Sequence, residues 1–98
     1  MDFKVKHVAL VKLNLKEADF WLIRKGSLLQ VGKPVRSFHA ERIGIQVVSE
    51  NLLPEYYFAV FQYWHEAGVL AQLAHGTLDL KHIRVEDVKE LPMLPKKT

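Results

Sequence analysis

The stretch PEYYFAVFQYWHEAGVLAQL, residues 54–73, decides the fold of this 98-residue chain. Its large apolar side chains recur at helical spacing and polar side chains fill the other side, which is the pattern of a half-buried helix. Pro54 suits the first helical position, and Glu55 lies at the positive end of the helix dipole. We predict one long helix over residues 54–73, ending before His75 and Gly76, where the glycine can supply a left-handed cap. The side chains expected in the core are Phe58, Phe61 and Trp64.

The sequence before this helix predicts strands. Apolar and polar residues alternate over residues 3–15, which predicts a strand with outward lysines at both ends. The aromatic and β-branched run at residues 19–23 predicts a second strand, ended by a turn at residues 24–27. A short return strand is expected at residues 28–31, and another alternating strand at residues 41–48.

The sequence after the long helix predicts a short strand at residues 78–83 and a second helix at residues 84–91. The predicted fold class is α+β: a strongly curved, mainly antiparallel sheet packed against the long helix and a short C-terminal helix. Residues 1–95 are expected to form a single domain, and residues 96–98 a solvated tail.

The composition narrows the class of protein. The chain has 14 Lys and Arg against 11 Asp and Glu, a formal net charge of +3, and no cysteine. The lack of cysteine excludes a disulfide framework, a thiolate metal site and a thiol nucleophile. No segment approaches the roughly 18 apolar residues of a membrane span, and the N-terminal residues do not resemble a signal peptide. We therefore expect a cytoplasmic protein with no membrane partner, whose mild positive charge is compatible with nucleic-acid binding.

Two basic segments punctuated by glycine are candidates for binding DNA, at residues 24–42 and at residues 76–84. Glycines allow close approach to a phosphate backbone, Ser27 and backbone N–H groups can donate to phosphate oxygens, and arginine can read guanine edges. Two alternatives stay open: a solvated, charged hairpin for the first segment and a strand with outward polar residues for the second. The candidate DNA-binding residues are Arg24, Lys25, Gly26, Ser27, Lys33, Arg36, Arg42, Thr77, Lys81, His82 and Arg84.

No motif in the sequence indicates catalysis or a bound metal. His65, His75 and His82 do not have the spacing of a helical metal-binding pair, and no cysteine joins them. The serines do not lie in a G-x-S-x-G nucleophile elbow, and VGKP at residues 31–34 is not a phosphate-binding P-loop. We expect no enzymatic activity, no metal and no cofactor. A small hydrolase using histidine and serine is the weakest alternative.

Four motifs follow one another along the chain. They are ADFWLIRKGS with VGKP at residues 18–34, IGIQV at residues 43–47, LLPEYYF at residues 52–58, and GTLDLKHI with VKELPMLP at residues 76–95. In this order they resemble the target recognition domains of type I restriction enzyme specificity subunits. The resemblance implies an α/β domain whose curled sheet and loops contact duplex DNA and read a short sequence.

The same resemblance implies which residues face the DNA. Residues 24–27 would belong to one DNA-facing loop, and Gly76, Thr77, Lys81 and His82 to another. The match is mainly to the C-terminal part of such a domain, and the long spacer helix of the family is not expected in this chain. The resemblance therefore predicts a stand-alone half-domain, which a homodimer could complete.

The function we predict is non-catalytic binding of double-stranded DNA through the basic loops, with phosphate contacts supplying most of the affinity. The alternative is a protein-interaction module that is a subunit or antagonist of a DNA-modifying complex, with a protein partner from a restriction-modification system. An exposed apolar patch around Leu28, Leu29 and Val31 would favour this alternative.

Overall fold

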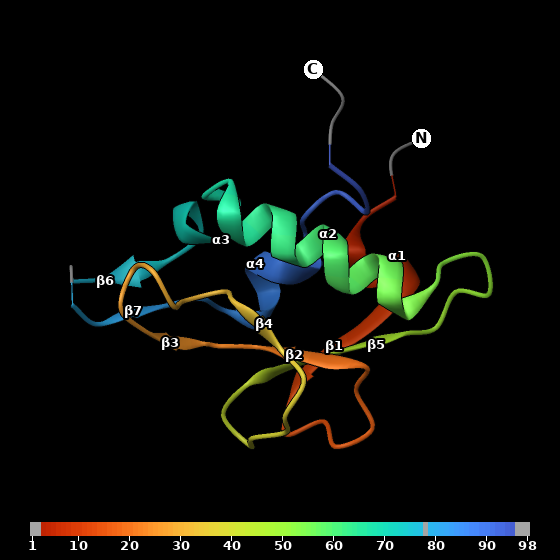
Figure 1. The fold of residues 1–98 in the computed structure, drawn as a ribbon, viewed down its shortest axis with the longest axis horizontal. Coiled ribbons are helices and arrows are strands. Elements are labelled where there is room, and N and C mark those ends of the chain that lie inside the picture. Colours follow the sequence, from red (N-terminus) through yellow and green to blue (C-terminus); the bar gives the residue numbers. More distant parts are fainter. Residues whose placement is uncertain (1–2, 78, 96–98) are drawn as a thin grey trace.

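The computed structural model describes residues 3–77 and 79–95, and its fold class is α+β, as predicted (Figure 1). The predicted tail at residues 96–98 lies outside the described residues, as does residue 78 of the predicted strand. The helices are α1 (Val5–Val8), α2 (Pro54–Glu66), α3 (Val69–Gln72) and α4 (Val85–Lys89). The strands are β1 (Ala9–Leu13), β2 (Phe20–Leu22), β3 (Lys25–Gly26), β4 (Pro34–Val35), β5 (Ile43–Val47), β6 (His75–Gly76) and β7 (Lys81–His82).

The strands form two antiparallel sheets, where the sequence had suggested one. The larger sheet has the strand order β1-β5-β2-β4, and the smaller sheet has the order β3-β7-β6. Figure 1 shows α2 lying along one side of the larger sheet, while the smaller sheet extends toward one end of the molecule. The smaller sheet therefore joins a segment from the first third of the chain to a segment from the last third.

Four elements form where the sequence predicts them. The strands β2 and β5 lie within the predicted residues 19–23 and 41–48, and they pair with each other in the middle of the larger sheet. The strand β7 lies within residues 78–83, and the helix α4 within residues 84–91. The segments of β2 and β5 combine an apolar pattern with turn residues nearby, so local sequence is sufficient to place these two strands.

The core lies between α2 and the larger sheet. Tyr57, Phe61 and Trp64 are buried on the helix, and Phe20 is buried on the facing strand β2. The rings of Phe61 and Trp64 meet edge to face with centroids 4.9 Å apart, a favoured arrangement for aromatic pairs. Phe58 is only partly buried and packs at the margin of this core. The core predicted for this helix is therefore confirmed for Phe61 and Trp64 and partly for Phe58.

The long helix predicted over residues 54–73 is divided into α2 and α3. Gly68 separates them with a φ of 81°, a conformation that glycine adopts at little cost. The predicted left-handed cap at Gly76 is wrong, because Gly76 lies in β6, beyond the end of α3. The helical pattern continues across Gly68 because Leu70 of α3 is buried in the same core as α2.

The predicted strand over residues 3–15 is wrong in its first half, which forms the helical turn α1. Val5 and Val8 are both buried, and their spacing of three residues suits a helix better than a strand. The N–H of Val5 donates to the carbonyl oxygen of Leu91 at 2.9 Å, so the C-terminal segment fixes this turn. The alternation was misleading because the deciding contact is with a distant part of the chain.

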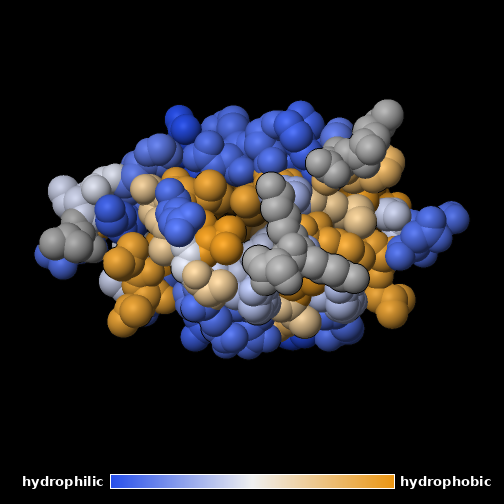
Figure 2. Space-filling view, turned by 90° about the horizontal axis from the view of Figure 1, so that it is seen from above, coloured by the Kyte–Doolittle hydropathy of each residue, from blue (hydrophilic) through white to orange (hydrophobic). Residues whose placement is uncertain are grey.

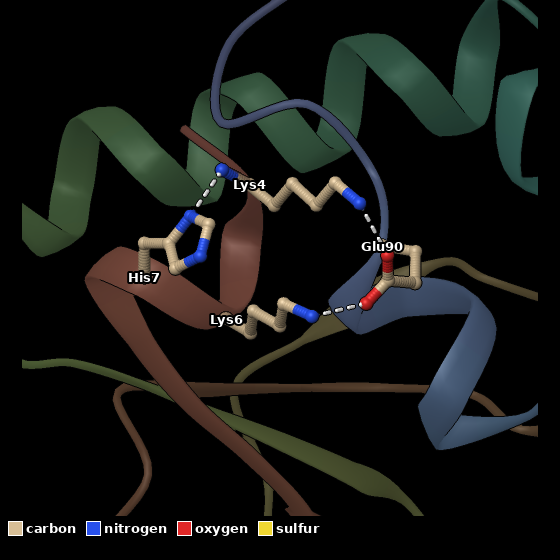
Figure 3. A network of polar contacts seen from close by, with 4 residues as sticks. All are labelled: Lys4, Lys6, His7 and Glu90. Carbon is tan, nitrogen blue, oxygen red and sulfur yellow. Dashed lines mark hydrogen bonds and ion pairs between the residues drawn. The ribbon is translucent and has the colours of Figure 1, made fainter. Parts of the chain in front are cut away.

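A polar network joins α1 to the end of α4 (Figure 3). The ammonium groups of Lys4 and Lys6 donate to the two carboxylate oxygens of Glu90, at 2.5 and 2.6 Å. The backbone N–H of Lys4 donates to Nδ1 of His7 at 2.8 Å, which caps α1. The hydrogen bonds from Lys4 and Lys6 lower the pKa of Glu90 to about 2. Both termini of the described chain are thus held together by charge as well as by packing.

The turn and return strand predicted after β2 are also wrong. The predicted turn contains the strand β3, and residues 28–31 form a turn in which the N–H of Val31 donates to the carbonyl oxygen of Ser27 at 3.0 Å. Val31 is buried, and a Cβ on the adjacent Gly32 would lie 2.6 Å from the Cβ of Leu70 on α3. The close approach of this turn to α3 therefore overrides the local preference for a strand.

Candidate nucleic-acid interface

The two basic segments predicted to bind DNA meet in the smaller sheet. The strands β3 and β7 pair so that Lys25 lies opposite His82 and Gly26 opposite Lys81. The strands β6 and β7 pair so that His75 lies opposite the same His82. The sequence suggested two separate loops, whereas the structure places these residues in one sheet.

The hairpin that joins β6 to β7 depends on Gly76. This residue has a φ of 107°, and a Cβ on it would lie 2.3 Å from the carbonyl oxygen of Leu80. Only glycine fits such a position without a shift of the backbone. The ammonium group of Lys81 donates to the carbonyl oxygen of Gly76 at 3.3 Å, and Thr77 is exposed in the turn. The hairpin therefore exposes the Thr77 side chain, while the Lys81 ammonium group bonds within the hairpin.

Arg24 is held by contacts inside the protein. Its Nε donates to the backbone carbonyl oxygen of Glu41 at 3.0 Å, and its Nη2 lies 3.6 Å from a carboxylate oxygen of Glu41. Its backbone carbonyl accepts a hydrogen bond from the N–H of Ile83 at 3.0 Å. Arg24 thus anchors the start of β3, and its charge is partly balanced.

Three other predicted residues of the first segment are exposed. Lys25 lies on β3, Ser27 follows it, and Lys33 lies at the end of the following turn. No carboxylate among the described residues forms an ion pair with Lys25 or Lys33. These two ammonium groups are therefore available to an anionic partner.

A carboxylate in α4 holds two basic side chains beside the smaller sheet. Asp87 accepts hydrogen bonds from Nε and Nη2 of Arg84, at 3.1 and 3.3 Å, and lies 3.2 Å from Nε2 of His75. The hydrogen bond from Arg84, followed by the contact with His75, lowers the pKa of Asp87, and the same bond raises the pKa of Arg84. His75 was not predicted as a binding residue, because its position opposite His82 follows from the pairing of β6 with β7 and not from a sequence pattern.

Arg36 and Arg42 lie outside the smaller sheet and make contacts within the protein. Arg36 donates to both carboxylate oxygens of Glu55, at 3.1 and 2.8 Å, and its guanidinium carbon lies 3.9 Å from the ring centroid of Phe58. Arg42 donates from Nη1 to both the carbonyl oxygen and the hydroxyl of Ser37, each at 2.8 Å. The structure therefore does not bring these two arginines together with Lys25 and Lys81, and their role in binding DNA stays a prediction.

The structure also bears on metal binding and on membrane insertion. Within residues 3–77 and 79–95, no group of three or more His, Asp or Glu side chains is arranged to hold a metal ion. In the same part of the chain, no helix is both long enough and apolar enough to cross a bilayer. His65, one of the three histidines considered in the sequence, bonds instead through Nε2 to the carbonyl oxygen of Leu29 at 2.8 Å.

Comparison with known proteins gives a likeness of fold. No family model matches the chain, and neither does any curated protein. The structure is similar to the crystal structure of the S subunit of a type I restriction-modification system from M. genitalium, with a TM-score of 0.69 and 14% sequence identity. The similarity covers 94% of this chain and 33% of that chain, so this chain spans about a third of the subunit's length. At this identity the comparison establishes a shared fold, and the match to the C-terminal part of a target recognition domain stays a prediction.

Proposed function

We propose that this chain is a non-catalytic DNA-binding domain that contacts duplex DNA through the smaller sheet. The observation that carries the proposal is the pairing of β3 with β7, which brings the two basic segments into one sheet and places Lys25 and His82 on the same face of it. The fold likeness to a subunit of a restriction-modification system supports it, and so do the four motifs in the sequence. Binding to DNA also fits the cytoplasmic location expected from the sequence.

The smaller sheet offers the groups that phosphate oxygens require. Lys25 and Lys81 supply charge, while Ser27 and Thr77 supply hydroxyl donors at the ends of β3 and β6. Each phosphate that a cation neutralises releases counterions from the DNA, so the logarithm of affinity falls with the logarithm of salt concentration by about 0.9 per contact. Lys33, Arg36 and Arg42 are proposed as secondary contacts, and Arg24 as the residue that positions β3.

The test is a fluorescence-anisotropy titration of a random-sequence duplex at several salt concentrations. The double variant Lys25→Ala, Lys81→Ala is expected to bind about tenfold more weakly and to lose about two units of salt slope. The control is Lys12→Ala, Lys16→Ala, which removes the same charge from two exposed positions outside the smaller sheet. Lys12 lies on β1 of the larger sheet, and Lys16 follows that strand. Circular dichroism checks that both variants are folded. Equal losses in the two variants, or no binding by the unaltered protein at low salt, would contradict the proposal.

A second candidate function rests on an apolar surface beside α2. Figure 2 shows apolar residues along the middle of the face seen from above, between polar margins. Leu53, Tyr56 and Leu94 help to line one hollow of about 350 Å³, and Tyr63 and Pro95 help to line another of about 260 Å³. Such a surface is typical of protein-interaction sites.

The patch predicted around Leu28, Leu29 and Val31 is not that surface. Leu29 is 84% exposed, but Val31 is fully buried, so the three residues do not form one patch. This finding corrects the location expected for a protein-binding site.

The partner to test first at the α2 surface is a second copy of this chain, as a homodimer was expected. Sedimentation velocity should then show a dimer that Leu53→Ser with Tyr56→Ser converts to a monomer. A monomer at all concentrations would leave a restriction-modification protein as the partner to test. In the protein-interaction alternative, DNA affinity is negligible and insensitive to salt.

A further inference from the structure

We propose that His75 and His82 form a proton-controlled phosphate-binding pair, which strengthens DNA binding by the smaller sheet when both imidazoles are protonated. This inference rests on the proposed DNA-binding function. It assigns a role to His75, which the sequence did not single out as a binding residue. It also gives the interface a dependence on pH that lysine and arginine alone would not have.

The geometry places both imidazoles inside the candidate interface. His75 and His82 are directly opposite each other on β6 and β7, and their ring centroids are 5.6 Å apart. His82 is also directly opposite Lys25 on β3, and its neighbour in β7 is Lys81. Because side chains alternate along a strand, Lys25 lies on the same face as both imidazoles and Lys81 on the other face, so a phosphate that contacts Lys25 lies close to the pair.

Charged side chains belong to each of the elements around the pair. The cations are Lys25 on β3, Lys81 on β7, and Arg84 and Lys89 at the two ends of α4. The carboxylates are Asp79 between β6 and β7, and Glu86 and Asp87 on α4. The nearby Arg24 is paired with Glu41. Protonation of both imidazoles adds two positive charges to this set.

The contact with Asp87 does not cancel the effect of protonating His75. The carboxylate of Asp87 already accepts two hydrogen bonds from Arg84, and it lies 3.2 Å from Nε2 of His75. One negative charge is thus shared by two basic groups, so protonation of His75 leaves a surplus positive charge at this site. His82 makes no ion pair with a carboxylate within the described residues, so its proton adds a full charge.

Histidine is the side chain whose charge changes between about pH 5 and pH 8, so the change falls in an accessible range. Each added phosphate contact steepens the salt dependence by about 0.9. We therefore expect DNA affinity to rise by about tenfold from about pH 8 to about pH 6 at constant ionic strength, with a salt slope steeper by about two.

The experiment is the same anisotropy titration, carried out with the full chain at both pH values. His75→Gln with His82→Gln should gain no affinity when the pH is lowered, whatever its affinity at the higher pH. His7→Gln is the control, because His7 is exposed on α1 and caps that helix away from the smaller sheet. It should keep the full pH dependence. Since glutamine at both positions could disturb the hairpin, His82→Lys is the second variant, and its permanent charge should strengthen binding at about pH 8.

The outcomes separate this inference from the proposed function. Salt-sensitive DNA binding that is equal at both pH values overturns the role of the histidine pair and leaves the DNA-binding function in place. A pH dependence that persists in the double glutamine variant does the same, because another group would then be responsible. No DNA binding at either pH overturns both.

Discussion

Arg36 covers one face of Phe58, with its guanidinium carbon 3.9 Å from the ring centroid, while both of its terminal nitrogens donate to Glu55. Arg36 follows β4, and both partners lie in the first turns of α2. One side chain therefore joins the edge of the larger sheet to the start of the helix that covers it. A planar guanidinium can stack and form a forked ion pair at the same time, which lysine cannot do.

Arg36→Gln should lower the free energy of unfolding by about 1 kcal/mol, because it removes a cation–π contact at a half-exposed site. Glu55→Gln keeps the stacking and removes only an exposed ion pair, so its effect should be about 0.3 kcal/mol. Urea denaturation followed by tryptophan fluorescence measures both. Equal effects of the two substitutions would show that the ring contact contributes little. If folded Arg36→Gln also binds DNA more weakly, the arginine is a DNA contact as well.

Tyr57→Phe should raise the free energy of unfolding by about 1 kcal/mol, because the hydroxyl of Tyr57 is buried and has no hydrogen-bond partner among the described residues. Burial without a partner also raises the pKa of this phenol. Tyr63→Phe is the matched control on the same helix, where the side chain is 57% exposed and no change is expected. Thermal unfolding measures both variants. A loss of stability in Tyr57→Phe would mean that a partner, such as a bound water, satisfies the hydroxyl.

The parts of the fold that the sequence predicted correctly are those whose signal is local. The helix α2 was predictable because Tyr57, Phe61 and Trp64 recur on one face over about two turns. The strands β2 and β5 combine apolar runs with clear turn signals. By contrast, α1 is fixed by the hydrogen bond between Val5 and Leu91, which lie near opposite ends of the chain. A contact of this kind cannot be predicted from the sequence pattern of residues 3–15.

The candidate site was predictable in composition but not in arrangement. Charge and glycine content identified the two basic segments, yet strands of two residues such as β3 and β7 have no periodicity from which to predict their pairing. Whether a cation is free also depends on tertiary structure. Arg24 is balanced by Glu41, which lies 17 residues away in the sequence, whereas Lys25 beside it has no such partner among the described residues.

Gly76→Ala should destabilise the smaller sheet. A Cβ would lie 2.3 Å from the carbonyl oxygen of Leu80, and the φ of 107° is unfavourable for alanine, so we expect a cost of about 2 kcal/mol. Gly68→Ala is the control, because its φ is also positive but a Cβ there meets nothing within 4 Å; its cost should be about 1 kcal/mol. Amide hydrogen exchange should speed up at Lys81 and His82 only in Gly76→Ala. Unchanged exchange there would show that the hairpin can adjust.

Glu90→Gln should destabilise the protein in a way that depends on pH. The hydrogen bonds from Lys4 and Lys6 lower the pKa of Glu90 from 4.5 to about 2 in the folded state, so folding favours the ionised carboxylate. The resulting stabilisation is fully present above about pH 4.5 and is lost as the pH falls toward about 2. The unaltered protein should therefore unfold at a higher urea concentration than Glu90→Gln at neutral pH, and the two curves should converge in acid.

Glu66→Gln is the control for this prediction, because Glu66 is exposed and forms no ion pair within the described residues. It removes the same charge, so any general effect of net charge appears equally in both variants. Since the network with Glu90 joins α1 to the end of α4, its loss should also speed amide exchange at Val5, whose N–H donates to Leu91. A difference between Glu90→Gln and the unaltered protein that stays constant down to about pH 2 would show that neither lysine binds the carboxylate in solution.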